Sequence, residues 1–224
     1  MKRLLLPLFC LILVSQIQAQ YKPVILGLRI GTDLSWVKPN VEEYSSEGVR
    51  MGFTWGFISE FYVMENYAIS TGFNMNFIGG KLEYPYQMDA DTGTLHRVYH
   101  MKYLQIPLCL KMKTELNEKL TMFGKIGLGT AFCIGARADD DFDYTGGTES
   151  ASKKNINDDV ALMRESLIVG GGVELKIKGS TAIIVELTYD NCFNNILTGN
   201  NPLPGVGDPK AVLNFVELGA GIVF

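Results

Sequence analysis

The densest group of potential metal ligands in the sequence is the acidic run DDDFDYTGG, Asp139–Gly147. Asp139, Asp141 and Asp143 fall at positions 1, 3 and 5 of an EF-hand-like calcium loop. Tyr144 replaces the glycine that position 6 needs for its sharp turn, and Ser150 replaces the bidentate glutamate of position 12. We therefore expect a solvated acidic loop, and cation binding over Asp139–Asp143 stays an open alternative.

The histidines His96 and His100 are the other residues that could do chemistry. Their i, i+4 spacing brings two metal ligands together only in a helix, which the neighbouring residues do not favour. A membrane-embedded hydrolase or acyltransferase would need a histidine, a serine and an acid together, for which His100, a loop serine and Asp190 could be combined. No spacing requires that combination. The sequence therefore predicts no catalytic residue, no metal site and no cofactor.

Other charged residues form a stronger pattern, because each of them stands between apolar or small neighbours. They are Arg29, Asp33, Arg50, Glu60, Lys111, Lys125, Glu174, Glu186 and Glu217. Alternation with a period of two is typical of a β-strand that has one polar and one apolar face. We therefore expect these charges to share the polar faces of their strands.

The same alternation appears in eight runs along the chain. They are Val24–Trp36, Val49–Val63, Tyr67–Phe77, Met101–Lys113, Leu120–Ile134, Leu167–Ile177, Thr181–Asp190 and Val216–Phe224. A few apolar residues interrupt the polar face, namely Ile58, Phe123, Ile184, Phe215 and Val223. The pattern predicts an all-β protein with eight antiparallel strands.

The connections between the runs alternate in length without exception. Long connections cover residues 37–48, 78–100, 135–166 and 191–211, whereas short ones cover residues 64–66, 114–119 and 178–180. Short periplasmic turns and long outer loops are typical of an outer-membrane β-barrel. This arrangement would also place both termini in the periplasm.

The direction of the apolar face follows from the cost of burying charge in lipid. An Arg or Lys facing the middle of the bilayer costs about 2–4 kcal/mol, so the apolar faces must point outward if the strands cross a membrane. The alternative is a soluble lipocalin-like barrel or β-sandwich with its apolar face inward. That alternative would crowd several Trp and Phe side chains inside and place many of the 24 glycines on a solvated surface. We therefore favour the membrane barrel.

The inward charges could line a pore or form a plug. Eight strands leave an interior only just wide enough for side chains, which favours an ion-paired plug without an aqueous channel. Glycines on the inner face would make room for the long charged side chains. We expect the pairs to fix the strand register more than to add stability.

The first 19 residues are typical of a secretory signal peptide. Lys2 and Arg3 precede the apolar stretch Leu4–Val14, and Ala19 ends a small-residue exit. The predicted domains are therefore a signal peptide (residues 1–19) and an outer-membrane barrel (residues 20–224). Cys109, Cys133 and Cys192 then remain, an odd number that argues against a disulfide framework. The net charge of −4 disfavours binding to nucleic acid.

Several segments together resemble a known family. YLQIPLCLKMK (Tyr103–Lys113) and FGKIGLGTAF (Phe123–Phe132), with Asn66–Tyr84 and Thr188–Ile196, are similar to the PorT-type outer-membrane β-barrel proteins. The resemblance covers essentially the whole mature chain. It implies a barrel in the outer membrane and a role as an accessory component of type IX protein secretion, and it brings no catalytic residues.

The strand containing Pro107 needs a bulge or another local irregularity, because proline lacks the N–H of a regular ladder.

Three functional hypotheses follow. The first is a PorT-like, non-enzymatic barrel that works with envelope secretion components. The second is a stand-alone barrel for adhesion, surface binding or envelope integrity through its outer loops, and the third is a lipid-modifying enzyme. In each case the expected partners are outer-membrane lipid and the outer-membrane assembly machinery, for which the terminal aromatic Phe224 would be the signal. The oligomeric state stays open.

Overall fold

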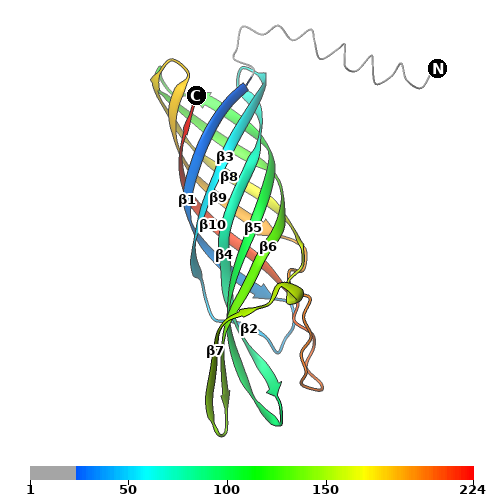
Figure 1. Ribbon diagram of the computed structural model, residues 1–224. Helices are drawn as coiled ribbons and strands as arrows, with labels where there is room; N and C mark the ends of the chain where they lie inside the picture. Colours follow the sequence, from blue (N-terminus) through cyan, green and yellow to red (C-terminus); the bar gives the residue numbers. More distant parts are fainter. Residues whose placement is uncertain (1–23) are drawn as a thin grey trace, which may run out of the picture.

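The computed structural model describes residues 24–224, in which the chain forms a closed antiparallel β-barrel (Figure 1). The barrel strands are β1 (Val24–Pro39), β3 (Arg50–Met64), β4 (Tyr67–Met88), β5 (Asp91–Glu115), β6 (Leu120–Tyr144), β8 (Met163–Lys178), β9 (Thr181–Cys192) and β10 (Ala211–Val223). They follow the order β4-β3-β1-β10-β9-β8-β6-β5, and pairing of β4 with β5 closes the ring. The predicted fold class is confirmed. The predicted signal peptide lies outside the described residues.

The two ends of the barrel differ as the connection lengths predict. At one end, here called the turn end, short turns join β3 to β4, β5 to β6 and β8 to β9. The start of β1 and the C-terminal residue lie at this end as well (Figure 1). The long connections gather at the opposite end, here called the loop end.

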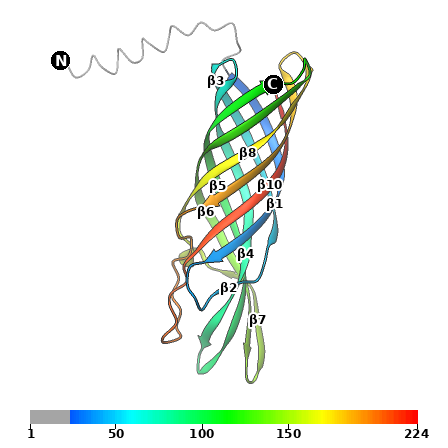
Figure 2. The ribbon, with the colours of Figure 1, turned by 180° about the vertical axis from the view of Figure 1, so that it is seen from behind.

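At the loop end, much of what the sequence assigned to loops is strand. β4 and β5 continue to a tight turn between Met88 and Asp91, while β6 continues to Tyr144 and pairs with β7 (Gly147–Asn155). Figure 2 shows these strands projecting beyond the barrel wall. We call this projection, formed by residues 78–100 and 136–155, the loop-end sheet. The strands extend into these long connections because alternation continues in them: Leu82 and Tyr84 are buried while their neighbours are more exposed.

Two short elements complete the loop end. β2 (Ser45–Ser46) pairs with β4, and the 3₁₀ helix η1 (Asn157–Asp159) follows β7. Within residues 24–224, no helix is long and apolar enough to cross a membrane.

The apolar faces of the barrel strands point outward. Leu28, Ile30 and Leu218 are each exposed over more than half of their surface, at 57%, 60% and 58%. The charged residue Asp33, in contrast, is fully buried inside. This arrangement contradicts the soluble alternative, because it leaves a continuous apolar outer wall that only a lipid environment can cover.

Two apolar clusters close the interior above and below its charged middle. At the turn end, Phe123, Ala182, Ile184 and Val223 pack together with Ile25 and Ile58. Four of the five apolar residues that interrupt the polar faces in sequence therefore form a plug, here called the turn-end plug, while the fifth, Phe215, joins the cluster at the loop end. At the loop end, a larger cluster covers the opening, and we call it the loop-end cap. Its members include Tyr44, Ile78, Leu82, Tyr84, Leu95, Tyr99, Met101, Phe142, Ile156, Ile196, Leu197 and Leu213.

Pro107 produces the local irregularity that its missing N–H requires. The β4–β5 ladder is interrupted between the Ser70–Cys109 and Asn74–Gln105 pairs. Gly72 lies in this gap with a φ of +138°, which only glycine adopts readily. The hydroxyl of Thr71 donates a hydrogen bond of 2.7 Å to the Pro107 carbonyl and partly replaces the lost ladder.

Candidate functional site: the closed interior and the loop-end surface

The middle of the barrel holds a first group of paired charges around Arg29. The Arg29 guanidinium contacts Glu217 and lies 2.8 Å from Glu186, whose second oxygen is 2.7 Å from the Lys125 ammonium. Arg29, Glu186 and Glu217 are buried. Because β1, β6, β9 and β10 each supply one member, the group connects four strands of the barrel wall.

A second group surrounds Lys111, which stands opposite Lys125 of the first group in the β5–β6 register. The Lys111 ammonium contacts Glu60 and lies 2.6 Å from Glu174, and it also lies 4.0 Å from the centre of the Phe123 ring. Lys113 adds contacts of 3.2 Å to Glu60 and 2.9 Å to Glu174. Two cations thus face two carboxylates, and the charges of the group balance.

A third group, nearer the loop end, has Arg164 at its centre. Its guanidinium is fully buried, contacts Asp190 and donates hydrogen bonds of 2.8 and 3.1 Å to the Leu213 carbonyl. Gln105 donates a hydrogen bond of 2.7 Å to the other oxygen of Asp190. Sequence reasoning missed Arg164 because it fell in a connection. Extending the alternation of the run Leu167–Ile177 by two polar-face positions, Ser166 and Arg164, would have found it.

Asp33, the remaining interior charge, makes fewer contacts. One carboxylate oxygen accepts a hydrogen bond of 2.8 Å from Thr54, and the other has no partner. Asp33 lies opposite Glu217 in the β1–β10 register.

Glycines make room for these groups, as the sequence predicts. A Cβ at Gly31 would lie 2.5 Å from a Glu217 oxygen, and one at Gly170 would lie 3.0 Å from Lys125. The gap left in the middle is only about 40 Å³. Such a gap holds a few water molecules at most. Because it lies between the plug at the turn end and the loop-end cap, it forms no continuous aqueous path.

Arg50 departs from the prediction that it faces inward. Its guanidinium lies 2.7 Å from Nδ1 of His100, a residue on the outer face of β5 between the buried Tyr99 and Met101. Nε2 of His100 lies 2.9 Å from Asp139. Arg50 is the first residue of β3, so its long side chain can cross the neighbouring Gly79, which has no Cβ to block it.

The acidic run does not form a calcium loop or a solvated loop. Asp139, Asp140, Asp141 and Asp143 are part of β6, so their side chains alternate between the two faces of the loop-end sheet. The buried Asp140 accepts two hydrogen bonds of 2.6 Å from Arg97. The others lie on the outer face, where a hydrogen bond from the backbone N–H of Lys153 lowers the pKa of Asp139.

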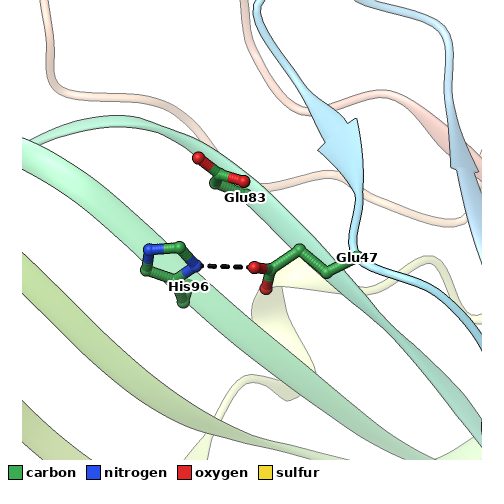
Figure 3. A group of neighbouring side chains, drawn as sticks. All are labelled: Glu47, Glu83 and His96. Atoms are coloured by element: carbon green, nitrogen blue, oxygen red, sulfur yellow. Dashed lines mark hydrogen bonds and ion pairs between the residues drawn. The ribbon is translucent and has the colours of Figure 1, made fainter.

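A cluster on that outer face could offer ligands to a cation. Figure 3 shows Glu47, Glu83 and His96, whose potential ligand atoms lie within 4.8 Å of one another. Glu47 already accepts a hydrogen bond of 2.8 Å from His96 and thereby raises the pKa of the imidazole. The pair is therefore satisfied without an ion. His96 and His100 point the same way from β5 but have different partners.

The structure separates the residues that an embedded enzyme would have needed. His100 lies on the outer face, whereas Asp190 is buried inside and engaged by Arg164 and Gln105. Among the described residues, the hydrogen-bond partners of the His100 ring are Arg50 and Asp139.

Comparison with known proteins places this architecture in a family. Residues 15–198 match the family model described as an outer membrane protein beta-barrel domain. The chain belongs to this family. Family membership locates the protein in the outer membrane. The match does not test the narrower resemblance to PorT-type proteins.

Two solved structures share the fold. Neisserial surface protein A is 11% identical, with 90% of this chain and 96% of that chain covered and a TM-score of 0.51. OprG from Pseudomonas aeruginosa is 12% identical, with 91% and 97% covered and a TM-score of 0.51. At such identities the likeness concerns the fold alone. No curated protein matches the sequence.

Proposed function

We propose that this protein is a non-enzymatic outer-membrane barrel that presents its loop-end sheet to a protein partner outside the membrane. The observation that carries the proposal is the packing of that sheet. Rings pack along its inner face, with centroids 6.1 Å apart for Tyr84–Tyr86 and 6.3 Å for Tyr86–Phe142, and Tyr44 from the connection after β1 stacks on Tyr84 at 4.5 Å. Together with the Arg97–Asp140 ion pair, these contacts make the projection a stiff platform rather than a set of mobile loops.

The closed interior supports a role at the surface. Paired charges and two apolar plugs leave no path for a solute, so we do not propose transport. The barrel instead serves as an anchor in the membrane.

The free edge of the loop-end sheet indicates the kind of partner. β7 is exposed along its whole length and pairs only with β6 among the described strands. An edge strand with an open side can pair with an extended segment of another polypeptide. We therefore propose an extended protein segment as the partner.

The proposal includes an orientation. Residues 1–19 would be removed on export, Phe224 would serve the assembly machinery, and the turn end would face the periplasm. Phe224 is half-exposed on the outer wall, where an assembly factor could reach it. To test the orientation, cysteine is introduced at Lys153 or at Asn117, and intact cells are treated with a membrane-impermeant thiol reagent. We expect labelling at position 153 only; labelling at 117 alone would reverse the orientation.

The platform is tested by replacing residues 147–155 with a glycine-serine segment of equal length. The control carries such a segment at turn residues 116–118. After crosslinking on cells, we expect one protein to co-purify with the wild type and the control but not with the β7 variant. Equal recovery with all three chains would refute the platform.

A role as an accessory component in type IX secretion is the second candidate, favoured by the resemblance at Tyr103–Lys113. A deletion strain should then fail to secrete its cargo proteins, and the β7 variant should not restore secretion. Normal secretion together with lost attachment to surfaces would favour the adhesion alternative instead. A His100→Ala strain should keep its lipid profile, and an altered profile would revive the enzyme hypothesis.

A further inference from the structure

The apolar outer wall ends at a definite level on strands β4, β5 and β6. On β5, the exposed Leu108 and Ile106 are followed toward the loop end by Lys102 and His100. On β6, the exposed Ile134 precedes Arg137, and on β4, Phe77 stands opposite Lys102 in register. The hydrocarbon region of the bilayer should therefore end near Phe77, Lys102 and Ile134.

A groove of about 460 Å³ opens at this level on the outer surface. Phe77 and Ile134 line its side toward the apolar wall. Arg50, Lys102, Arg137 and Lys153 also line it. The groove thus joins a lipid-facing surface to a cluster of four positive charges.

These cations differ from those inside the barrel because none of the four forms a direct ion pair, although the Asp139 carboxylate interacts with Arg50 and Lys153 over a longer distance. Within residues 24–224, no ion pair involves Arg50, Lys102, Arg137 or Lys153, whereas Arg29, Lys111, Lys125 and Arg164 are all paired. The acid that lines the groove, Asp139, is occupied by His100 and by the backbone N–H of Lys153. The groove therefore carries a net positive charge in a protein whose overall charge is −4.

Two amides in the groove can also donate hydrogen bonds. The side-chain oxygen of Asn157 accepts a bond of 2.6 Å from Ala136, and that of Asn155 accepts one of 3.0 Å from Asn157. In the described part of the chain, neither NH₂ group has an acceptor. Such donors suit the hydroxyl groups of a sugar.

We propose that this groove binds the phosphorylated sugar headgroup of an outer-leaflet glycolipid. The cations would bind its phosphates, Asn155 and Asn157 would bind its hydroxyl groups, and its acyl chains would lie along Phe77 and Ile134. The size of the groove is within the range of small-ligand sites. The inference rests on the proposed orientation, because only then does the loop end meet the outer leaflet.

The test uses the full barrel in phosphatidylcholine nanodiscs, with diphosphorylated lipid A as the probe. The variant Lys102→Gln/Arg137→Gln/Lys153→Gln removes three cations from the groove. The matched control Lys38→Gln/Lys119→Gln/Lys210→Gln removes three exposed cations that do not line the groove. Folding of each variant is checked by the shift in gel mobility on heating.

We expect the groove variant to bind lipid A about 100-fold more weakly than the control, since each basic residue near a membrane surface contributes about fivefold. Equal binding by the two variants, or equal binding of dephosphorylated lipid A by the wild type, would overturn the proposal. Inorganic phosphate should not compete at concentrations near that of the lipid, and strong competition would show a simple anion site. Binding of phosphatidylglycerol but not lipid A would exclude the glycolipid, while the labelling of intact cells decides the orientation separately.

Discussion

Replacing Lys111 with methionine should destabilise the barrel strongly, because it breaks a balanced group of buried charges. The Lys111 ammonium lies between Glu60 and Glu174 and is almost fully buried. After the substitution, Lys113 alone would face both carboxylates, so one negative charge would remain uncompensated in the interior. The contact of the ammonium with the Phe123 ring would also be lost.

The expected loss in the free energy of unfolding is about 3–5 kcal/mol, the usual cost of removing one partner from a buried ion pair. The variant Lys111→Met/Glu174→Gln restores the balance, because Lys113 then pairs with Glu60 alone. We expect this double variant to recover at least half of the loss. Urea unfolding in lipid vesicles, followed by the fluorescence of Trp36 and Trp55, measures both effects.

The exposed pair Lys176–Glu115 provides the matched control. Its members lie 2.5 Å apart at the turn end but remain open to solvent. Solvent screening makes such pairs weak, so Lys176→Met should leave the unfolding midpoint unchanged. If Lys111→Met unfolded at the same urea concentration as Lys176→Met, the interior charges would not be coupled as the structure indicates.

Three further outcomes are expected. Gly72→Val should lower the unfolding midpoint in urea far more than Gly135→Val. A Cβ at Gly72 would lie 1.9 Å from the Phe57 carbonyl oxygen, whereas one at Gly135 meets nothing within 4 Å. Equal midpoints for the two variants would contradict this reasoning. NMR titration should give His96 a pKa above its usual 6.5, and Glu47→Gln should reduce the increase, with the remainder due to Glu83 and Asp143. Because the folded pKa is the raised one, the stabilisation from this contact is complete below the unfolded pKa and disappears as the pH rises through the folded pKa. In planar bilayers the protein should give no stable conductance steps, and steps resembling those of a porin would refute a plugged interior.

The barrel itself could be predicted from the sequence because one physical signal is repeated in every strand. Each strand must present apolar residues to lipid and polar residues to the interior, so alternation gives both its position and its register. The alternating connection lengths supplied the arrangement of the two ends. Even the interruptions had a structural meaning, since Phe123, Ile184 and Val223 meet in the turn-end plug.

The loop end could not be predicted in the same way. Once the strands leave the membrane, no lipid requires an apolar outer face. In the loop-end sheet the alternating pattern places mainly apolar residues inside and mainly charged residues outside, and it extends over shorter stretches. The acidic residues of β6 then looked like a loop although Asp140 is an inward ion-pair partner. Arg50 was misplaced for a related reason, because a long side chain at a strand end can cross to the other face.

The structure leaves three surfaces through which this protein can act, since its interior is closed at both ends and in the middle. The turn end consists mainly of short turns and offers little area. The outer wall is apolar and meets lipid, except at the cationic groove where the wall ends. The loop-end sheet combines a packed aromatic face, an acidic outer face and an open edge at β7, so it alone has the area and stiffness for specific contact with another protein. A barrel that served only as a passive membrane component would not need such a projection. Substitutions at the loop end are therefore the first ones expected to abolish function.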